Sequence, residues 1–311
     1  MTLDREILAG RSVTIMAPNF ANGQCRSFRG DGLPDLLVRN TETGELFVHP
    51  HSGEFDGTGT FGPPVKIGDG FGWWRFFFVR AVDASGDGRA DICAFSTSEY
   101  DINPGENGEF GFFLLRNLGG PGEIGPFAEP LRVSSKRDDG QEWETIGFAD
   151  VTGTGTDDTF GRGKNAGNID LFPHRGQGVV RNDTYDKEPV RLIDVDVDDF
   201  PVAMADFTGN GTPDLLVRRP NGDMDLFEFA GKPGTTTEGT WYTVARGWQD
   251  MRIMTLTDVD LDGRPDLLGL RPDGTLDAYA HSGVFNPQAP LDLFREPVTV
   301  ATGFGKYDVV S

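Results

Sequence analysis

Short apolar runs separated by glycine-containing turns dominate the chain. The runs ELFVHP, NIDLFP and DMDLFEF are typical, and turns such as TETGE and RPNGD precede several of them. Turn residues between two runs rich in Leu, Phe and Val are a hairpin signal. No segment shows a sustained helical period. The pattern therefore predicts an all-β protein of short antiparallel strands, with helix as a minor component at most.

One nine-residue pattern occurs five times, with Gly at its sixth place and Asp at its ninth. The copies span residues 27–35, 83–91, 150–158, 206–214 and 258–266, and their starts lie 52 to 67 residues apart. An aromatic-marked run such as WWRFFFVRAVD leads into most copies, and an apolar run follows four of them. After the copy at 150–158, residues 159–164 read as a poor strand. Each repeat is thus expected to hold four strands.

A four-stranded sheet repeated around a circle is the blade of a β-propeller, and closure of the ring removes exposed sheet edges. We expect residues 1–311 to form a single five-bladed β-propeller, with residues 1–11 as a terminal arm. The C-terminal GFGKYDVVS echoes GFGWWRFFF near residue 70, so both termini are expected to meet in one blade. A stack of separate small β domains is the alternative, but no low-complexity linker supports it.

The composition argues against two kinds of binding partner, nucleic acid and the membrane interior. The chain has 28 Lys and Arg against 49 Asp and Glu, a net charge of −21 that would repel phosphates and argues against nucleic-acid binding. No window approaches the roughly 18 apolar residues of a membrane span. The N-terminus lacks signal-peptide features, which favours a cytoplasmic protein; secretion after signal removal is the alternative. Cys25 and Cys93 are two independent buried thiols or a single bridge.

The five copies can supply oxygen ligands. Side chains at places one, three and five converge, the glycine at six permits a sharp turn, the carbonyl at seven adds a ligand, and the ninth-place Asp closes the shell. Ca²⁺ prefers six to eight oxygens, whereas zinc and copper prefer nitrogen and sulfur. The predicted calcium ligands are Asp258, Asp260, Asp262, Arg264 and Asp266; Asp83, Ser85, Asp87, Arg89 and Asp91; and Asp206, Thr208, Asn210, Thr212 and Asp214.

Two copies are weaker candidates for calcium. The third offers Asp150, Thr152, Thr154 and Asp158, which include only two carboxylates. The first has Ser27 at place one and Arg29 at place three, where a cationic side chain would oppose a metal. We therefore interpret the first copy as a metal-free structural turn. For every copy the alternative is a β-turn stabilised by its Asp side chain without any ion.

These loops and their flanking strands resemble the FG-GAP/VCBS repeat family, whose calcium-loop propeller repeats also occur in integrin α-chain heads and several bacterial lectins. The resemblance rests on ADFTGNGTPDLLVR, TDVDLDGRPDLLGL and AVDASGDGRADICAF. It implies a calcium-binding propeller. It leaves function open, because such propellers serve as adhesion modules, lectins, lyases and accessory domains. Ser27, Arg29 and Thr154 depart from the family pattern.

Two sets of repeated residues are candidates for ligand contact. His51, His174 and His281 follow equivalent strands and could line repeated pockets, or could simply occupy a place that tolerates turn residues. Aromatic residues open the first strand of each blade and could stack on sugars in inter-blade grooves, or could wedge blades apart. The tryptophans of this set are Trp73, Trp74, Trp143 and Trp248.

Two functions remain open from the sequence. The first is a recognition module, similar to lectin propellers, for carbohydrate or another small polar ligand in inter-blade grooves or the central funnel. The second is a stand-alone enzyme of lyase, hydrolase or cyclase type with one site in the funnel. No known catalytic motif is present. The first candidate catalytic residues of such an enzyme are Arg75, Glu144, Asp250 and Arg252, with Arg80 beside them. The sequence favours no oligomeric state.

Overall fold

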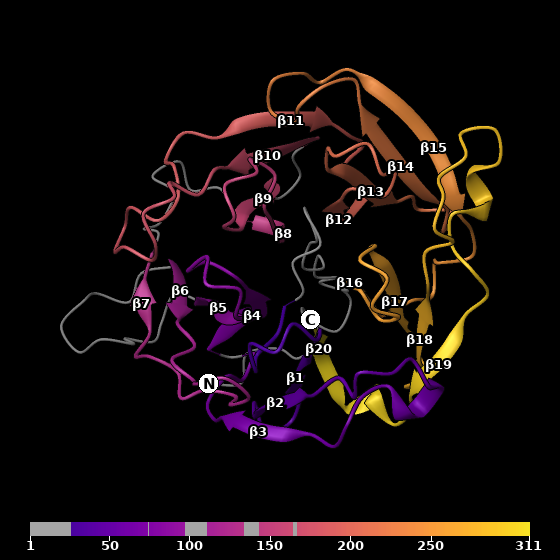
Figure 1. Ribbon diagram of the computed structural model, residues 1–311. Coiled ribbons are helices and arrows are strands. Elements are labelled where there is room, and N and C mark those ends of the chain that lie inside the picture. The colour runs from indigo at the N-terminus through magenta and orange to yellow at the C-terminus, as the bar shows by residue number, and fades with distance from the viewer. Residues whose placement is uncertain (1–25, 74, 97–110, 134–142, 164–166) are drawn as a thin grey trace, which may run out of the picture.

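Five four-stranded antiparallel sheets form a ring in the computed structural model, which describes residues 26–73, 75–96, 111–133, 143–163 and 167–311. Figure 1 shows the sheets as blades around a central axis, with β4, β8, β12, β16 and β20 innermost. In the described residues the helical segments are three single turns of 3₁₀ helix: η1 (Gly57–Gly59), η2 (Pro290–Asp292) and η3 (Phe304–Lys306). The predicted all-β five-bladed propeller is confirmed.

The blades are numbered in chain order, and the strands of each blade are named from the innermost outward. Blade 1 holds β20 (Tyr307–Val310), β1 (Leu36–Asn40), β2 (Leu46–His49) and β3 (Val65–Gly68). Blade 2 holds β4 (Phe76–Val82), β5 (Asp91–Ser96), β6 (Gly111–Leu115) and β7 (Leu131–Arg132). Blade 3 holds β8 (Trp143–Ala149), β9 (Asp158–Gly163), β10 (Asn168–Phe172) and β11 (Val190–Asp194). Blade 4 holds β12 (Phe200–Ala205), β13 (Asp214–Arg218), β14 (Met224–Phe229) and β15 (Gly239–Ala245). Blade 5 holds β16 (Ile253–Thr257), β17 (Asp266–Leu270), β18 (Leu276–Tyr279) and β19 (Val298–Ala301).

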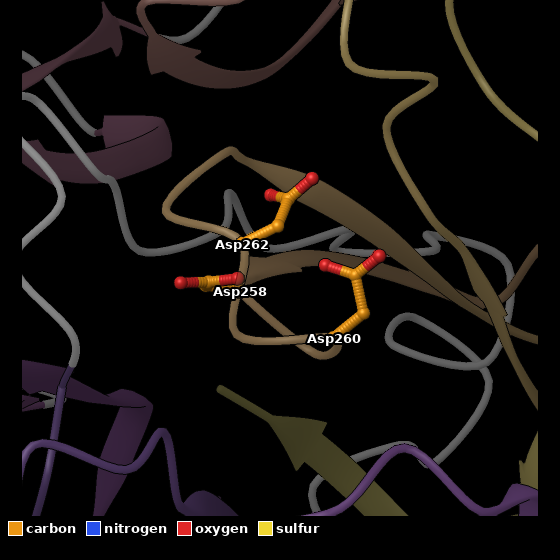
Figure 2. A group of neighbouring side chains, drawn as sticks. All are labelled: Asp258, Asp260 and Asp262. Atoms are coloured by element: carbon orange, nitrogen blue, oxygen red, sulfur yellow. The ribbon is translucent and has the colours of Figure 1, made fainter.

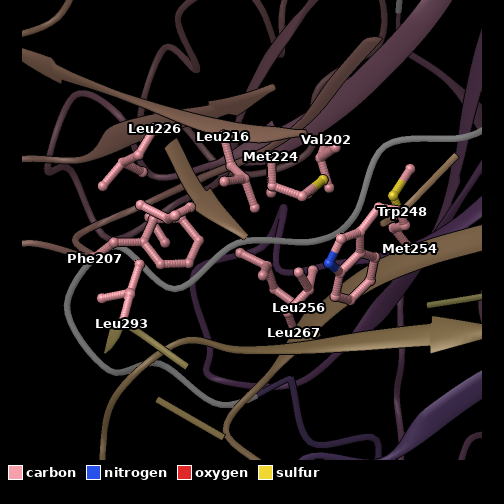
Figure 3. Close-up of a cluster of buried hydrophobic side chains, with 13 residues drawn as sticks. Val202, Phe207, Leu216, Met224, Leu226, Trp248, Met254, Leu256, Leu267 and Leu293 are labelled. Carbon is pink, nitrogen blue, oxygen red and sulfur yellow. The ribbon is translucent and has the colours of Figure 1, made fainter. Parts of the chain in front are cut away.

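The hydrophobic core lies between neighbouring blades. Each of five buried clusters draws its side chains from two adjacent blades, so each junction is a small core of its own. Figure 3 shows the cluster between blades 4 and 5, where Val202 and Leu226 face Leu256, Leu267 and Trp248. Burial of apolar surface is the main favourable term in folding, and here it acts at the junctions. Blade-to-blade contact therefore holds the ring together.

Residues 159–163, within the segment 159–164 that reads as a poor strand, form a better strand than the sequence indicates. β9 covers most of that segment, and all six of its residues are buried. The ring of Phe160 lies over Gly147 on β8, where an added Cβ would come within 2.5 Å of it. Arg162 donates through Nη1 to the carbonyl of Asp196 (3.1 Å). Packing and hydrogen bonds thus override a weak strand propensity.

The C-terminal strand closes the ring in blade 1, as expected from the sequence. β20 pairs with β1, and Leu37 and Ser311 exchange two backbone hydrogen bonds of 2.7 and 2.9 Å. The Arg39 guanidinium donates two hydrogen bonds, of 2.8 and 3.0 Å, to the carboxylate of Asp308. It also donates to the Phe76 carbonyl of blade 2 at 2.9 Å. One buried arginine therefore connects β1 and the C-terminal strand to the next blade.

Several predicted features lie outside the described residues, namely the arm at 1–11, the thiol of Cys25, and Trp74. Cys93 is buried in β5. No helix in the described part of the chain is long and apolar enough to cross a membrane.

The Arg39 clasp gives a first test. We expect Arg39→Met to lower the free energy of unfolding by about 3 kcal/mol, because the carbonyls of Phe71 and Phe76 lose a buried donor and Asp308 loses its ion-pair partner. The control is Lys66→Met, whose ion pairs with Glu45 and Asp69 are solvent-exposed and should contribute much less to stability. Urea titration followed by tryptophan fluorescence measures both. Equal losses in the two variants would contradict the clasp.

Candidate metal centre and blade junctions

The five nine-residue loops gather on one face of the propeller, which we call the loop face. Each loop precedes the second strand of its blade, and neighbouring loops touch: Asp157 N–H donates to the Asp83 carbonyl at 3.1 Å. The first-place side chain fixes each turn by accepting backbone N–H groups. Asp150, for example, accepts from Thr154 (2.7 Å) and Gly155 (2.8 Å). Gly155 has φ of +84°, a conformation that favours glycine.

The ninth-place Asp of each loop is buried, and in four of the five loops it connects the loop to the outer strands. In the last loop, Asp266 accepts through Oδ2 from Val259 N–H (2.8 Å) and through Oδ1 from His281 N–H (2.7 Å). The first, second and third loops repeat this with Asp35, Asp91 and Asp158. Burial raises the pKa of Asp266 to about 8. These oxygens face N–H groups, so the ninth place acts here as a structural anchor.

The last loop brings three further carboxylates together. One ligand oxygen each of Asp258, Asp260 and Asp262 lies within 4.8 Å of the others, and Figure 2 shows the three side chains on a single loop. Asp258 Oδ1 and Asp260 Oδ1 are buried and have no hydrogen-bond partner among the described residues. Burial, with repulsion from neighbouring carboxylates, raises the pKa of Asp258 to about 6 and also raises that of Asp260. Such a set suits a hard divalent cation.

One cationic side chain borders this site. Arg295 Nη1 lies 3.2 Å from Asp260 Oδ2, and its side chain is about half exposed. Sequence reasoning missed Arg295 because it lies far from the loop in sequence. Because the guanidinium is half exposed, solvent screens its attraction to Asp260.

The second and third loops use their oxygens differently. Asp83 accepts from the N–H groups of Gly86 and Gly88, and Ser85 Oγ is buried without a partner among the described residues. In the third loop the hydroxyl of Thr152 donates to Asp158 (3.1 Å). Within the described residues, only the last loop places three acids close enough to share an ion.

The fourth loop is short of carboxylates. Asn210 turns toward strand β14 and donates through Nδ2 to Glu228 (3.2 Å). Asp214 Oδ1 is buried with no partner among the described residues. Burial raises the pKa of Asp214 to about 8, and the Asp206 and Glu228 carboxylates add to the effect. In this loop the predicted third- and fifth-place ligands are a threonine and an outward-turned amide.

The three predicted ligand histidines are buried at blade junctions. His51 and His281 hydrogen bond through Nε2 to the second-place carbonyls of the preceding blade's loop, Val259 and Phe207, both at 3.0 Å. His174 lies at the same place beside Ala84. The Nδ1 atom of each ring accepts the N–H of a glycine two residues on, which makes Nε2 the donor in a neutral ring. Burial lowers the pKa of all three. This placement assigns them to junctions and leaves them little free surface.

Asn117 plays the same role in blade 2, and sequence reasoning missed it. Its Nδ2 donates to the carbonyl of Phe28 in the first loop (2.8 Å), and its Oδ1 accepts the N–H of Gly119 (3.0 Å). We call His51, Asn117, His174 and His281 the junction latches. The shared signal is position: each follows the third strand of its blade.

The predicted aromatic and funnel residues do not form one described site. Trp248 is only 2% exposed and packs between blades 4 and 5, while Trp73 is 39% exposed in the turn before β4. Trp143 and Glu144 lie on β8, with side chains outside the described residues. Arg80 is buried, and burial lowers its pKa to about 9.

The remaining funnel candidates make local contacts at the starts of the innermost strands. Arg75 lies over the ring of Phe76, 5.3 Å from its centroid. Asp250 is exposed in the turn before β16, and Arg252 donates to the Gly305 carbonyl at 3.3 Å.

The latches give a second test. We expect His281→Ala to lower the free energy of unfolding by about 2 kcal/mol, because the Phe207 carbonyl is left buried and unpaired. His281→Asn should lose much less, since asparagine already fills this role at position 117. Denaturant titrations at pH 8, where the ring is neutral, compare the two variants. Equal losses would show that the hydrogen bond to Phe207 contributes little.

Comparison with known proteins finds a family match in two segments of the chain. Residues 28–94 and 206–269 match the family model of the FG-GAP-like repeat. No curated protein matches the chain. Among solved structures, a candidate 6-phosphogluconolactonase from Bacteroides uniformis has 11% identity and a TM-score of 0.35, over 88% of this chain and 70% of that one. One from Bacteroides fragilis has 10% identity and a TM-score of 0.37, over 88% and 69%. Likeness this distant carries no functional argument.

Proposed function

We propose, from the match of residues 28–94 and 206–269 to the FG-GAP-like repeat, that this chain is a calcium-stabilised β-propeller that serves as a recognition module. The observation that carries the calcium part is the last loop. There, two buried carboxylate oxygens, on Asp258 and Asp260, have no hydrogen-bond partner among the described residues, and Asp262 lies beside them. Leaving buried charged oxygens unpaired is costly. A bound divalent cation would offset that cost.

The residues present fit calcium at this loop. Asp258, Asp260 and Asp262 would hold the ion together with the Arg264 carbonyl, all of them oxygen donors. When bound, the ion supplies positive charge among carboxylates that repel one another. It would also reduce the net charge of −21, which opposes a compact state. The second and fourth loops, around Asp83 and Asp206, are weaker sites on the same argument.

Calcium removal tests this part. We expect calcium to raise the thermal midpoint of the wild type by several degrees relative to chelator, because an ion that binds only the folded chain stabilises it by mass action. Asp260→Asn should abolish most of that shift. Asp198→Asn, at an exposed position in the turn between β11 and β12, is the matched control and should keep it. A midpoint that is identical with calcium and chelator would refute calcium stabilisation.

The recognition part of the proposal rests on an exposed aromatic. The indole of Trp73 is 39% exposed in the turn that leads into blade 2, whereas Trp248 is sealed in the core. An exposed indole can stack on the apolar face of a sugar ring or another small polar ligand. Carbohydrate is therefore the proposed ligand class, with contact at the junction of blades 1 and 2.

A glycan-array screen tests the recognition role. We expect a hit for the wild type and at least a tenfold weaker affinity for Trp73→Ala, while Trp248→Phe, which alters only the core, should bind as the wild type does. Absence of any glycan hit would overturn the carbohydrate proposal. It would favour the alternative of a stand-alone propeller enzyme, with Arg75, Asp250 and Arg252 as the first substitutions.

A further inference from the structure

The first loop contains a cation of its own. The Arg29 guanidinium, at the third place, reaches back into the loop through Nη2. It lies 3.2 Å from Asp31 Oδ2 and 3.1 Å from Asp35 Oδ1, and it donates to the His51 carbonyl at 2.8 Å. Its side chain is only 22% exposed. One positive group thus touches the fifth- and ninth-place carboxylates and a backbone carbonyl.

The rest of the first loop has the same geometry as its four counterparts. Phe28 N–H donates to Asp35 Oδ2 (2.9 Å), and His51 N–H donates to Asp35 Oδ1 (3.0 Å), the same two bonds that anchor the last loop. Ser27 takes the first place, where its hydroxyl accepts Asp31 N–H (3.2 Å) and donates to Asp31 Oδ1 (2.8 Å). The turn is therefore complete without an ion.

Electrostatics explains why this loop needs a positive group and why it is poorly suited to a metal. Burial raises the pKa of Asp35, and the adjacent Arg29 charge opposes that rise. A guanidinium stays protonated at all physiological pH values. A divalent cation placed between Asp31 and Asp35 would meet that fixed charge at a few ångströms, and the repulsion would disfavour binding.

We propose that Arg29 is the permanent cation of the first loop and replaces a metal ion there. Blade 1, which joins the two ends of the described chain, is then independent of metal. The same cluster includes His51, whose backbone carbonyl binds Arg29 and whose ring binds Val259 of blade 5. Removing calcium would therefore loosen the last loop of blade 5 while the ring-closing blade keeps its own charge balance.

The first arm of the test measures stability with and without chelator. Arg29→Met keeps the aliphatic stem and removes the charge. It should lower the thermal midpoint by several degrees to the same extent in calcium and in chelator. Asp260→Asn, by contrast, should lower it only when calcium is present. An Arg29→Met midpoint equal to that of the wild type in chelator would overturn the proposal.

The second arm counts cation sites by calcium calorimetry and terbium luminescence. The variant S27D/R29D places acids at places one and three and should bind one more ion per chain than the wild type. The control S27D/R246D has the same net charge but keeps Arg29. It should bind no additional ion. No gain in S27D/R29D, or an equal gain in the control, would overturn the proposal.

The two arms separate this inference from calcium stabilisation of the wild type. If the wild type binds no calcium, but Arg29→Met is destabilised in chelator and S27D/R29D acquires a site, the role of Arg29 stands and the calcium proposal falls. If the wild type binds calcium but Arg29→Met is neutral, the reverse holds.

Discussion

A buried carboxylate at the ninth place of each loop is the constraint on which the ring depends. In four blades it accepts one N–H from its own loop and one from the residue that follows the third strand, as Asp266 does with Val259 and His281. In three of these blades the second residue, His51, Asn117 or His281, then bonds across to the preceding blade's loop through its ring or amide. A single carboxyl group therefore connects the loop, the outer strands and the next junction. Its burial is unfavourable in free energy, so nearby positive or donor groups decide how stable each blade is.

The blades offset the unfavourable free energy of burying this carboxylate in different ways. The first loop uses a guanidinium, Arg29, and the third uses threonine hydroxyls such as Thr152. The last loop places three more acids close together instead, with Arg295 beside Asp260. The loops share one backbone turn, yet their side chains differ in how many acids they bring together. Loss of repeat symmetry in the sequence is thus a difference in charge balance at equal geometry.

Much of the fold could be predicted from the sequence because it depends on local patterns. Apolar runs located the strands, and the recurring Gly and Asp fixed the number of blades. The strand at 159–164 was misjudged because its stability comes from Gly147 on a neighbouring strand, which no local pattern reveals. The sequence showed that the histidines occupy equivalent positions, but it did not show which way their rings point. Whether a ring such as His281 faces a ligand or the next blade depends on how blades pack, and that requires three-dimensional coordinates.

The junction between blades 3 and 4 is built differently from the other four. Residues 229 and 230 of blade 4 are Phe and Ala, so this blade has no imidazole or amide at the latch position. Its contact with the third loop is the exposed Lys232, whose Nζ donates to the Thr152 carbonyl at 2.9 Å. Without the N–H that the other blades supply, Asp214 Oδ1 lacks a partner among the described residues, and the pKa of Asp214 is raised.

Strand β14 runs on to Phe229 and pairs with β15 there, so the chain does not turn back toward the loop. Longer outer strands in blade 4 therefore take the place of the latch, and hydrophobic packing of Phe227 and Phe229 against blade 3 bears most of that junction.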